Sequence, residues 1–168
     1  MDMMSIRRAA LLGSVEKGEI AYEAFNLSFD GTSSTVINTG IYLFTAENIN
    51  RDFEFIAEDI QGKTNSTNTI ICAKHNGNSY GFLVRIYDNT ATTYNGSIFM
   101  KADVSGTVIV RRINGQISLS GKNIRNPDVQ FVNAVFDWPL VLGCAIDDDG
   151  TYYRYKSGTI GHVRLKWL

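Results

Sequence analysis

The chain has 168 residues, a length that fits one domain and is sufficient to bury a hydrophobic core. Its formal net charge is −1, so it lacks the basic excess that is typical of nucleic-acid binding and of polybasic membrane contacts. Hydrophobic residues make up 44% of the chain, which excludes a disordered protein, and 15 Gly with only 2 Pro favour strands and turns over helices.

Residues 3–16 are the stretch with helical periodicity, and they contain a short apolar run. That run ends after about seven residues, before Glu16 and Lys17, which is too short for a secretion signal or a membrane span. A lone helix of this length is marginal in water. We therefore expect it to pack, either on its own domain or as an anchor in a larger assembly. The expected anchor residues are Met4, Ile6, Arg7, Arg8, Leu11, Leu12 and Val15.

From Phe25 onward the pattern has period two, which is typical of strands with one buried and one solvated face. Such alternation is clearest over residues 53–57, 82–87, 108–111 and 162–167. Gly, Asn and Asp cluster between the runs, and Asn114-Gly115 predicts a two-residue hairpin turn. The spacing of about ten residues indicates an antiparallel sandwich or jelly roll. We predict an N-terminal helical arm over 1–24 and a sandwich over 25–168.

Both cysteines lie in apolar, strand-like runs. Two buried thiols and a disulfide between Cys72 and Cys144 both remain open, because sequence does not place their Cα atoms. No Cys/His cluster of the kind that binds structural zinc is present. An immunoglobulin-like sandwich is an alternative fold, but the Trp expected soon after the first Cys is missing.

Several stretches together resemble the concanavalin A-like, laminin-G-like jelly-roll domains. These stretches read FDGTSSTVINTGIYLF (29–44), YGFLVRIYDN (80–89), GTVIVRRINGQISLSG (106–121) and the closing PLVLGCAI with SGTIGHVRLKW. The resemblance covers most of residues 25–168 and implies an all-β, two-sheet antiparallel jelly-roll sandwich. The opening MDMMSIRRAALLG is similar to the start of tail-associated proteins of tailed bacteriophages and prophages. That similarity implies a virion protein: a tail, baseplate or fibre component, or a capsid decoration.

Because the fold family includes glycoside hydrolases, a pair of carboxylates was sought first. Asp52 and Glu54 share a strand face, but Asn50 stands where a further Glu would be needed, and we expect a solvated face there. His75 lies in a turn and His162 points outward, and no Gly-x-Ser-x-Gly elbow is present. The sequence therefore predicts no catalytic residues and a protein that is not an enzyme.

Three consecutive acidic residues, Asp147, Asp148 and Asp149, precede Gly150 and are the best candidate for a cation site. Calcium prefers such hard oxygen ligands, although the spacing differs from that of a calcium loop. A solvated turn and a contact with a partner are the alternatives, and we assign no metal and no cofactor.

Aromatic residues follow this acidic turn directly and can act in one of three ways. They can stack on sugar rings while nearby carboxylates and amides bind hydroxyl groups, they can form a protein interface, or they can be structural. The candidate residues for glycan or partner binding are Asp147, Asp148, Asp149, Tyr152, Tyr153, Tyr155, Asn76 and Asn78.

The sequence thus leads to two functional hypotheses. The first is a structural virion protein, assembled in the host cytoplasm, that binds other virion proteins through its arm and forms a homo-oligomer such as a trimer. The alternative is a carbohydrate-binding adhesion module that recognises host cell-surface polysaccharide. Neither hypothesis involves nucleic acid or a membrane.

Overall fold

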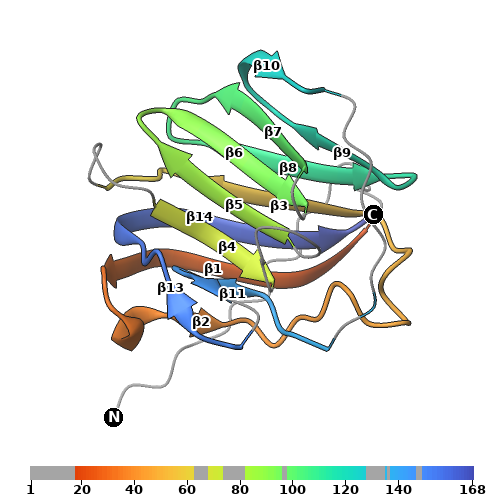
Figure 1. Cartoon of the computed structure of the whole chain (residues 1–168), viewed down its shortest axis with the longest axis horizontal. Coiled ribbons are helices and arrows are strands. Elements are labelled where there is room, and N and C mark those ends of the chain that lie inside the picture. The colour runs from red at the N-terminus through yellow and green to blue at the C-terminus, as the bar shows by residue number, and fades with distance from the viewer. Residues whose placement is uncertain are drawn as a thin grey trace, which may run out of the picture.

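The computed structural model describes residues 18–62, 68–73, 82–95, 98–127, 135, 137–146 and 149–168. These residues form a five-stranded sheet and a seven-stranded sheet, which lie one behind the other in Figure 1, and a two-stranded ribbon. All of the pairings are antiparallel. The predicted all-β jelly-roll sandwich is therefore confirmed.

The strands of each sheet come from distant parts of the chain. The five-stranded sheet has the order β1 (Glu19–Asp30), β14 (Ser157–Trp167), β3 (Phe53–Glu58), β8 (Val108–Ile113) and β9 (Gln116–Leu119). The seven-stranded sheet has the order β10 (Lys122–Arg125), β7 (Ile98–Asp103), β6 (Thr90–Asn95), β5 (Phe82–Tyr87), β4 (Asn68–Ala73), β11 (Val141–Leu142) and β2 (Ile37–Asn38). The ribbon is β12 (Ala145–Ile146) with β13 (Tyr152–Tyr153), and one 3-10 turn, η1, spans Ser33–Thr35.

The sandwich begins earlier than the sequence suggests. Residues 19–24, which we had placed in the helical arm, belong to β1 and pair with the last strand, so that Glu19 lies opposite Trp167. The predicted helix and its anchor residues, Met4 to Val15, lie outside the described residues. No helix in the described part of the chain has the length and apolar character needed to cross a membrane.

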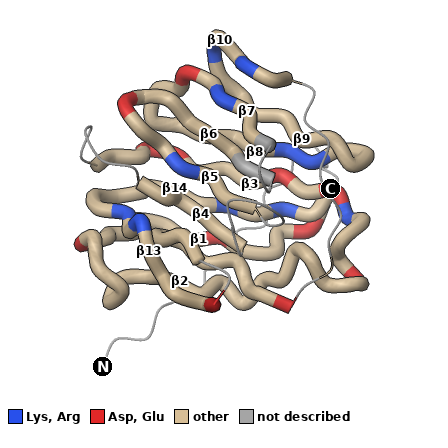
Figure 2. The backbone as a smooth tube through the Cα atoms, in the orientation of Figure 1, with Lys and Arg blue, Asp and Glu red and all other residues tan. Residues whose placement is uncertain are grey.

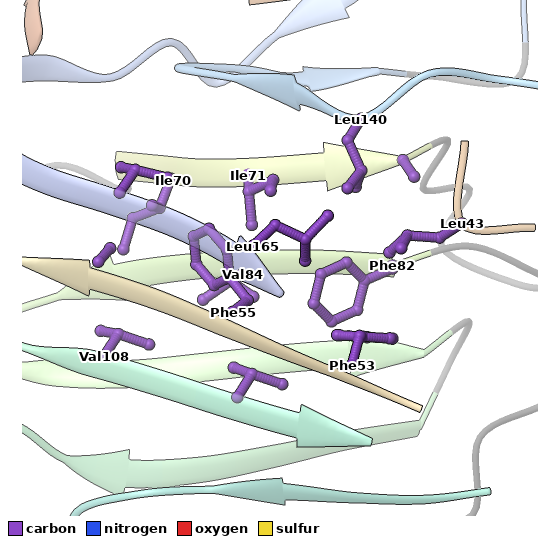
Figure 3. Packing of buried hydrophobic residues seen from close by; sticks show 14 of the residues in the cluster. Leu43, Phe53, Phe55, Ile70, Ile71, Phe82, Val84, Val108, Leu140 and Leu165 are labelled. Carbon is purple, nitrogen blue, oxygen red and sulfur yellow. The ribbon is translucent and has the colours of Figure 1, made fainter. Parts of the chain in front are cut away.

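Aromatic and aliphatic side chains fill the space between the two sheets. Phe53 and Phe55 from β3 face Phe82 and Val84 from β5, and all four are at most 2% exposed. Figure 3 shows these side chains pointing towards one another from opposite layers. The rings of Phe53 and Phe82 meet edge to face with centroids 5.7 Å apart, an arrangement that aromatic pairs prefer. The predicted alternation over residues 53–57 thus places the expected residues in the core.

The predicted hairpin turn at Asn114-Gly115 joins β8 to β9. Asn114 has φ 51° and Gly115 has φ 78°, the left-handed values that a type I′ turn requires at both positions. The turn sets the register in which Arg112 lies opposite Ile117. The sequence prediction is confirmed here because turn chemistry is a local property.

The outward face of the five-stranded sheet carries ion pairs rather than simple solvated charges. Glu54, which we expected to be solvated, is 8% exposed and lies between Arg111 and Arg164. The expectation was wrong because two long arginine side chains from the neighbouring strands β8 and β14 cover the carboxylate. Lys166, expected on the same solvated face, is only 6% exposed.

A second group on this face joins the three strands β1, β14 and β3. Both ring nitrogens of His162 contact carboxylates: Nδ1 lies 2.7 Å from Glu58 Oε2 and Nε2 lies 2.9 Å from Glu23 Oε1. Phe25 stacks on the imidazole with ring centroids 4.7 Å apart. Burial opposes the charged imidazole, but the hydrogen bonds with Glu58 and Glu23 outweigh it and raise the pKa of His162.

We predict that this group stabilises the fold in a pH-dependent way. Because the pKa of His162 is higher in the folded than in the unfolded state, its contribution is fully present below about pH 6.5 and is lost as the pH rises through the folded-state pKa. Urea unfolding of the wild type and of His162→Gln, at pH 6 and pH 8.5, should therefore give a larger stability difference at pH 6. An equal difference at the two pH values would contradict the assignment.

Candidate functional site

Residues 143–146 and 149–156, hereafter the tyrosine loop, lie on the outward face of the seven-stranded sheet. Beneath it is a second buried cluster, separate from the main core, to which β4 contributes Cys72 and β5 contributes Leu83. Trp138, Tyr153 and Tyr155 pack against this cluster. The loop is therefore held on the sheet by burial of apolar surface, which is the dominant favourable term in folding.

The tyrosine loop contains those predicted site residues that the structure describes. Tyr152 is 37% exposed, whereas Tyr153 and Tyr155 are half-buried. The hydroxyl of Tyr155 donates to the carbonyl of Tyr152 at 2.8 Å, and Asp149 Oδ1 accepts from the backbone N–H of Thr151 at 2.8 Å. Hydrogen bonds from Thr151 lower the pKa of Asp149, so its carboxylate is charged at neutral pH.

The other predicted site residues are not described. Asn76, Asn78, Asp147 and Asp148 all lie outside the described residues, and their part in a site stays a prediction. Among the residues that are described, no group of three or more His, Cys, Asp or Glu side chains is arranged to hold a metal ion. Calcium at Asp147–Asp149, one of the three candidate roles of this turn, stays untested.

Next to the tyrosine loop, the same face of the sheet carries a row of basic residues. The row runs Arg85, Thr92, Lys101 and Arg125, each opposite the next in the neighbouring strands β5, β6, β7 and β10. Strands lie about 4.8 Å apart, so the Cα atoms of Arg85 and Lys101 are about 10 Å apart, with the short Thr92 between them. Figure 2 shows basic positions along β5, β7 and β10. Arg85 and Lys101 are half-buried, and Arg125 is exposed.

Aromatic rings lie close to these charges. Lys101 Nζ is 5.1 Å from the centroid of Phe99, which is two residues along the same strand and therefore on the same face. In the tyrosine loop, the guanidinium carbon of Arg154 is 5.1 Å from the centroid of Tyr153. Leu83, which the loop covers, precedes Arg85 by two residues on the same face of β5. The loop and the basic row therefore lie on one face of the sheet.

Two hollows in the described part of the sandwich lie away from the tyrosines of the loop. A groove of about 430 Å³ is lined by residues that include Asp103, Ser105 and Lys122, and a cavity of about 60 Å³ lies beside Lys156. The tyrosines of the loop line neither hollow. The candidate site is thus a surface of the sheet and its covering loop, not a pocket.

Sequence reasoning named the tyrosines as candidates and did not name the basic row. Its signal was present, because Arg85 alternates with the apolar residues of β5 and so had to point outward. The alternation does not reveal that β7 lies two strands from β5, which brings Lys101 into the same row. Lys156 was also missed, because nothing in its sequence neighbourhood indicates burial.

No protein-family model matches the chain, and no curated protein matches it. Solved structures do share its fold. The carbohydrate-binding module CBM40 of Ruminococcus gnavus IT-sialidase matches with a TM-score of 0.66 and 11% identity, over 88% of this chain and 92% of that one. The same module bound to α2,6 sialyllactose matches with a TM-score of 0.65 and 12% identity, over 88% of this chain and 92% of that one.

A leech intramolecular trans-sialidase also matches, with a TM-score of 0.66 and 13% identity. The match covers 90% of this chain but only 26% of the enzyme, so the chain spans about a quarter of that protein. At these identities the likeness concerns the fold alone. It agrees with the jelly-roll resemblance seen in the sequence. The comparisons contain no support for a phage origin, and the virion role and the oligomer stay predictions.

The two cysteines provide a test of how firmly the tyrosine loop covers the sheet. Cys72 and Cys144 form no disulfide with each other and are fully buried, Cys72 beneath the loop and Cys144 within it, and burial raises the pKa of Cys144 to about 12. We predict that neither thiol reacts with Ellman's reagent at pH 8 in the folded protein and that both react in guanidinium chloride. Fast reaction of either thiol without denaturant would contradict the packing, and the absence of reactive thiols after unfolding would indicate a disulfide.

Proposed function

We propose that this protein is a non-catalytic carbohydrate-binding module whose site is the outward face of the seven-stranded sheet with the tyrosine loop. The observation that carries the proposal is that Arg85 and Lys101 lie on the same face of the sheet as Leu83, which the aromatic loop covers. The shared fold with modules bound to sialyllactose supports it. Sugar recognition of this kind requires aromatic faces for the ring and polar groups for the hydroxyls.

The charge of the site favours an acidic sugar. Arg presents a planar fork of N–H donors that matches the two oxygens of a carboxylate, and Lys adds a mobile point charge. Arg85 and Lys101 lie far enough apart to contact different groups of one ligand. Thr92, which has a shorter side chain, lies between them. We therefore propose a carboxylate-bearing glycan, such as a sialylated oligosaccharide, as the ligand class.

The ion pairs of the opposite sheet argue against placing the site there. Glu54 lies between Arg111 and Arg164, and Asp52 Oδ1 accepts from the backbone N–H of Asn114 at 2.9 Å. These side chains are already engaged with one another, so they are poorly placed to bind the hydroxyl groups of a sugar. Host cell-surface polysaccharide, named above as the alternative partner, suits the open sheet face better.

We predict that wild-type protein binds 3′- or 6′-sialyllactose in isothermal titration calorimetry and binds lactose much more weakly. Arg85→Gln should weaken sialyllactose binding by about 10- to 100-fold, since a hydrogen bond to a charged group contributes about 1.5–3 kcal/mol. Arg85→Lys should weaken binding less, because it keeps the charge and loses only the fork.

The matched control is Arg111→Lys, the same exchange on the opposite sheet. It should leave binding unchanged, because Arg111 contacts Glu54 and does not face the proposed site. The proposal fails if the wild type binds no acidic glycan, or if Arg85→Lys and Arg111→Lys have equal effects on affinity.

A further inference from the structure

The buried Lys156 has no role in the site described so far. It is 1% exposed and lies directly before β14. Its Nζ donates to two backbone carbonyls, that of Gln61 at 2.6 Å and that of Ser157 at 2.7 Å. Within the described residues it forms no ion pair with a carboxylate. Burying an ammonium group whose hydrogen-bond partners are all neutral carbonyls lowers the stability of the fold, so we looked for a role that Lys156 has in the structure.

Lys156 also lies at the neck of the tyrosine loop, the place where its first residue, Gly143, and its last residue, Lys156, meet. Its backbone N–H donates to the carbonyl of Gly143 at 2.7 Å, which closes the loop between its first and last residues. Gly143 in turn donates to Ile70 in β4 at 3.0 Å, and the N–H of Ser157 donates to Asn68 Oδ1 at 3.0 Å. The neck is thus joined to β4 on both of its sides.

At this neck two chain segments approach so closely that glycine is required on each. A Cβ on Gly62 would lie 2.5 Å from the carbonyl oxygen of Ser157 and 2.9 Å from Lys156 Nζ. A Cβ on Gly158, which has φ 95°, would lie 2.3 Å from the carbonyl oxygen of Gln61. The ammonium therefore sits at the crossing of the two segments and bridges them through their carbonyls.

We infer that Lys156 is a positioning residue, an internal cation that fixes the tyrosine loop on the seven-stranded sheet and so holds Tyr153 and Tyr155 against the cluster of Cys72 and Leu83. This inference rests on the proposed function, because it concerns the same surface. Lys156 places a positive charge at hydrogen-bonding distance from the carbonyls of Gln61 and Ser157, as a bound cation would.

The titration of Lys156 supplies a signature that a neutral side chain lacks. Burial lowers its pKa to about 8. The unfolded chain therefore binds more protons than the folded chain between about pH 8 and the ordinary lysine pKa of 10.5, and the stability of the fold rises with pH across that interval. Among the described residues that line the adjacent cavity, Asp88 is the other charged group. The neutral amine still has two N–H donors for the two carbonyls, so the loop stays fixed above pH 8.

The test compares Lys156→Met with Lys166→Met, which removes the other buried lysine, located near the end of β14 and away from the loop. Hydrogen–deuterium exchange of a peptide covering residues 149–155 reports the loop, and titration with sialyllactose reports the site. We expect Lys156→Met to raise exchange in this peptide at least tenfold and to weaken sialyllactose binding at least tenfold. It should keep β3 protected, and it should lose the rise in stability between pH 8 and pH 10.5. Lys166→Met should leave loop exchange unchanged.

Lys156→Arg is the rescue variant, because it keeps the N–H donors and has the cavity of about 60 Å³ to extend into. It should restore low exchange in the loop, and it keeps the test decisive if Lys156→Met does not fold. Unchanged loop exchange in Lys156→Met, or an open loop in Lys156→Arg, would overturn the inference. If the wild type binds no glycan, the proposed function fails, but the exchange data still decide the role of Lys156.

Discussion

Each sheet of this protein can bury only one face against the other, and that packing depends on the aromatic side chains between them. Phe53, Phe55 and Phe82 are at most 2% exposed and come from strands that are distant in sequence. These rings fill the space between the sheets. A shift of β3 or β5 by one residue would turn them to solvent, so the register of both strands is fixed. The same register decides which side chains of these strands point outward.

The two outward faces are then used differently. On the five-stranded sheet, charged residues pair with one another, as Glu54 does with Arg111 and Arg164. On the seven-stranded sheet, the tyrosine loop covers the part near Cys72 and Leu83, and the basic row lies on the same face. The first face carries ion pairs among its own side chains, whereas the second carries aromatic rings together with basic residues.

The fold could be predicted from the sequence because its signals are local. Alternation placed Phe53 and Phe55 in the core, and Asn114-Gly115 specified a turn whose dihedral angles only such residues adopt readily. The basic part of the candidate site could not be predicted. Arg85 and Lys101 fall in one row because β5 and β7 both pair with β6, and the sequence does not reveal that pairing. The burial of Glu54 was missed for a similar reason, since its two partners come from separate strands.

The pairing of the first strand with the last has a mechanical consequence. Glu19 lies opposite Trp167, so the chain enters and leaves the sandwich at adjacent positions on neighbouring antiparallel strands. A pulling force applied across these two points loads the hydrogen bonds between β1 and β14 one after another, starting at that end, instead of all together. The sandwich is therefore built to open like a zipper under tension, and a covalent link between its two ends would span only a short gap.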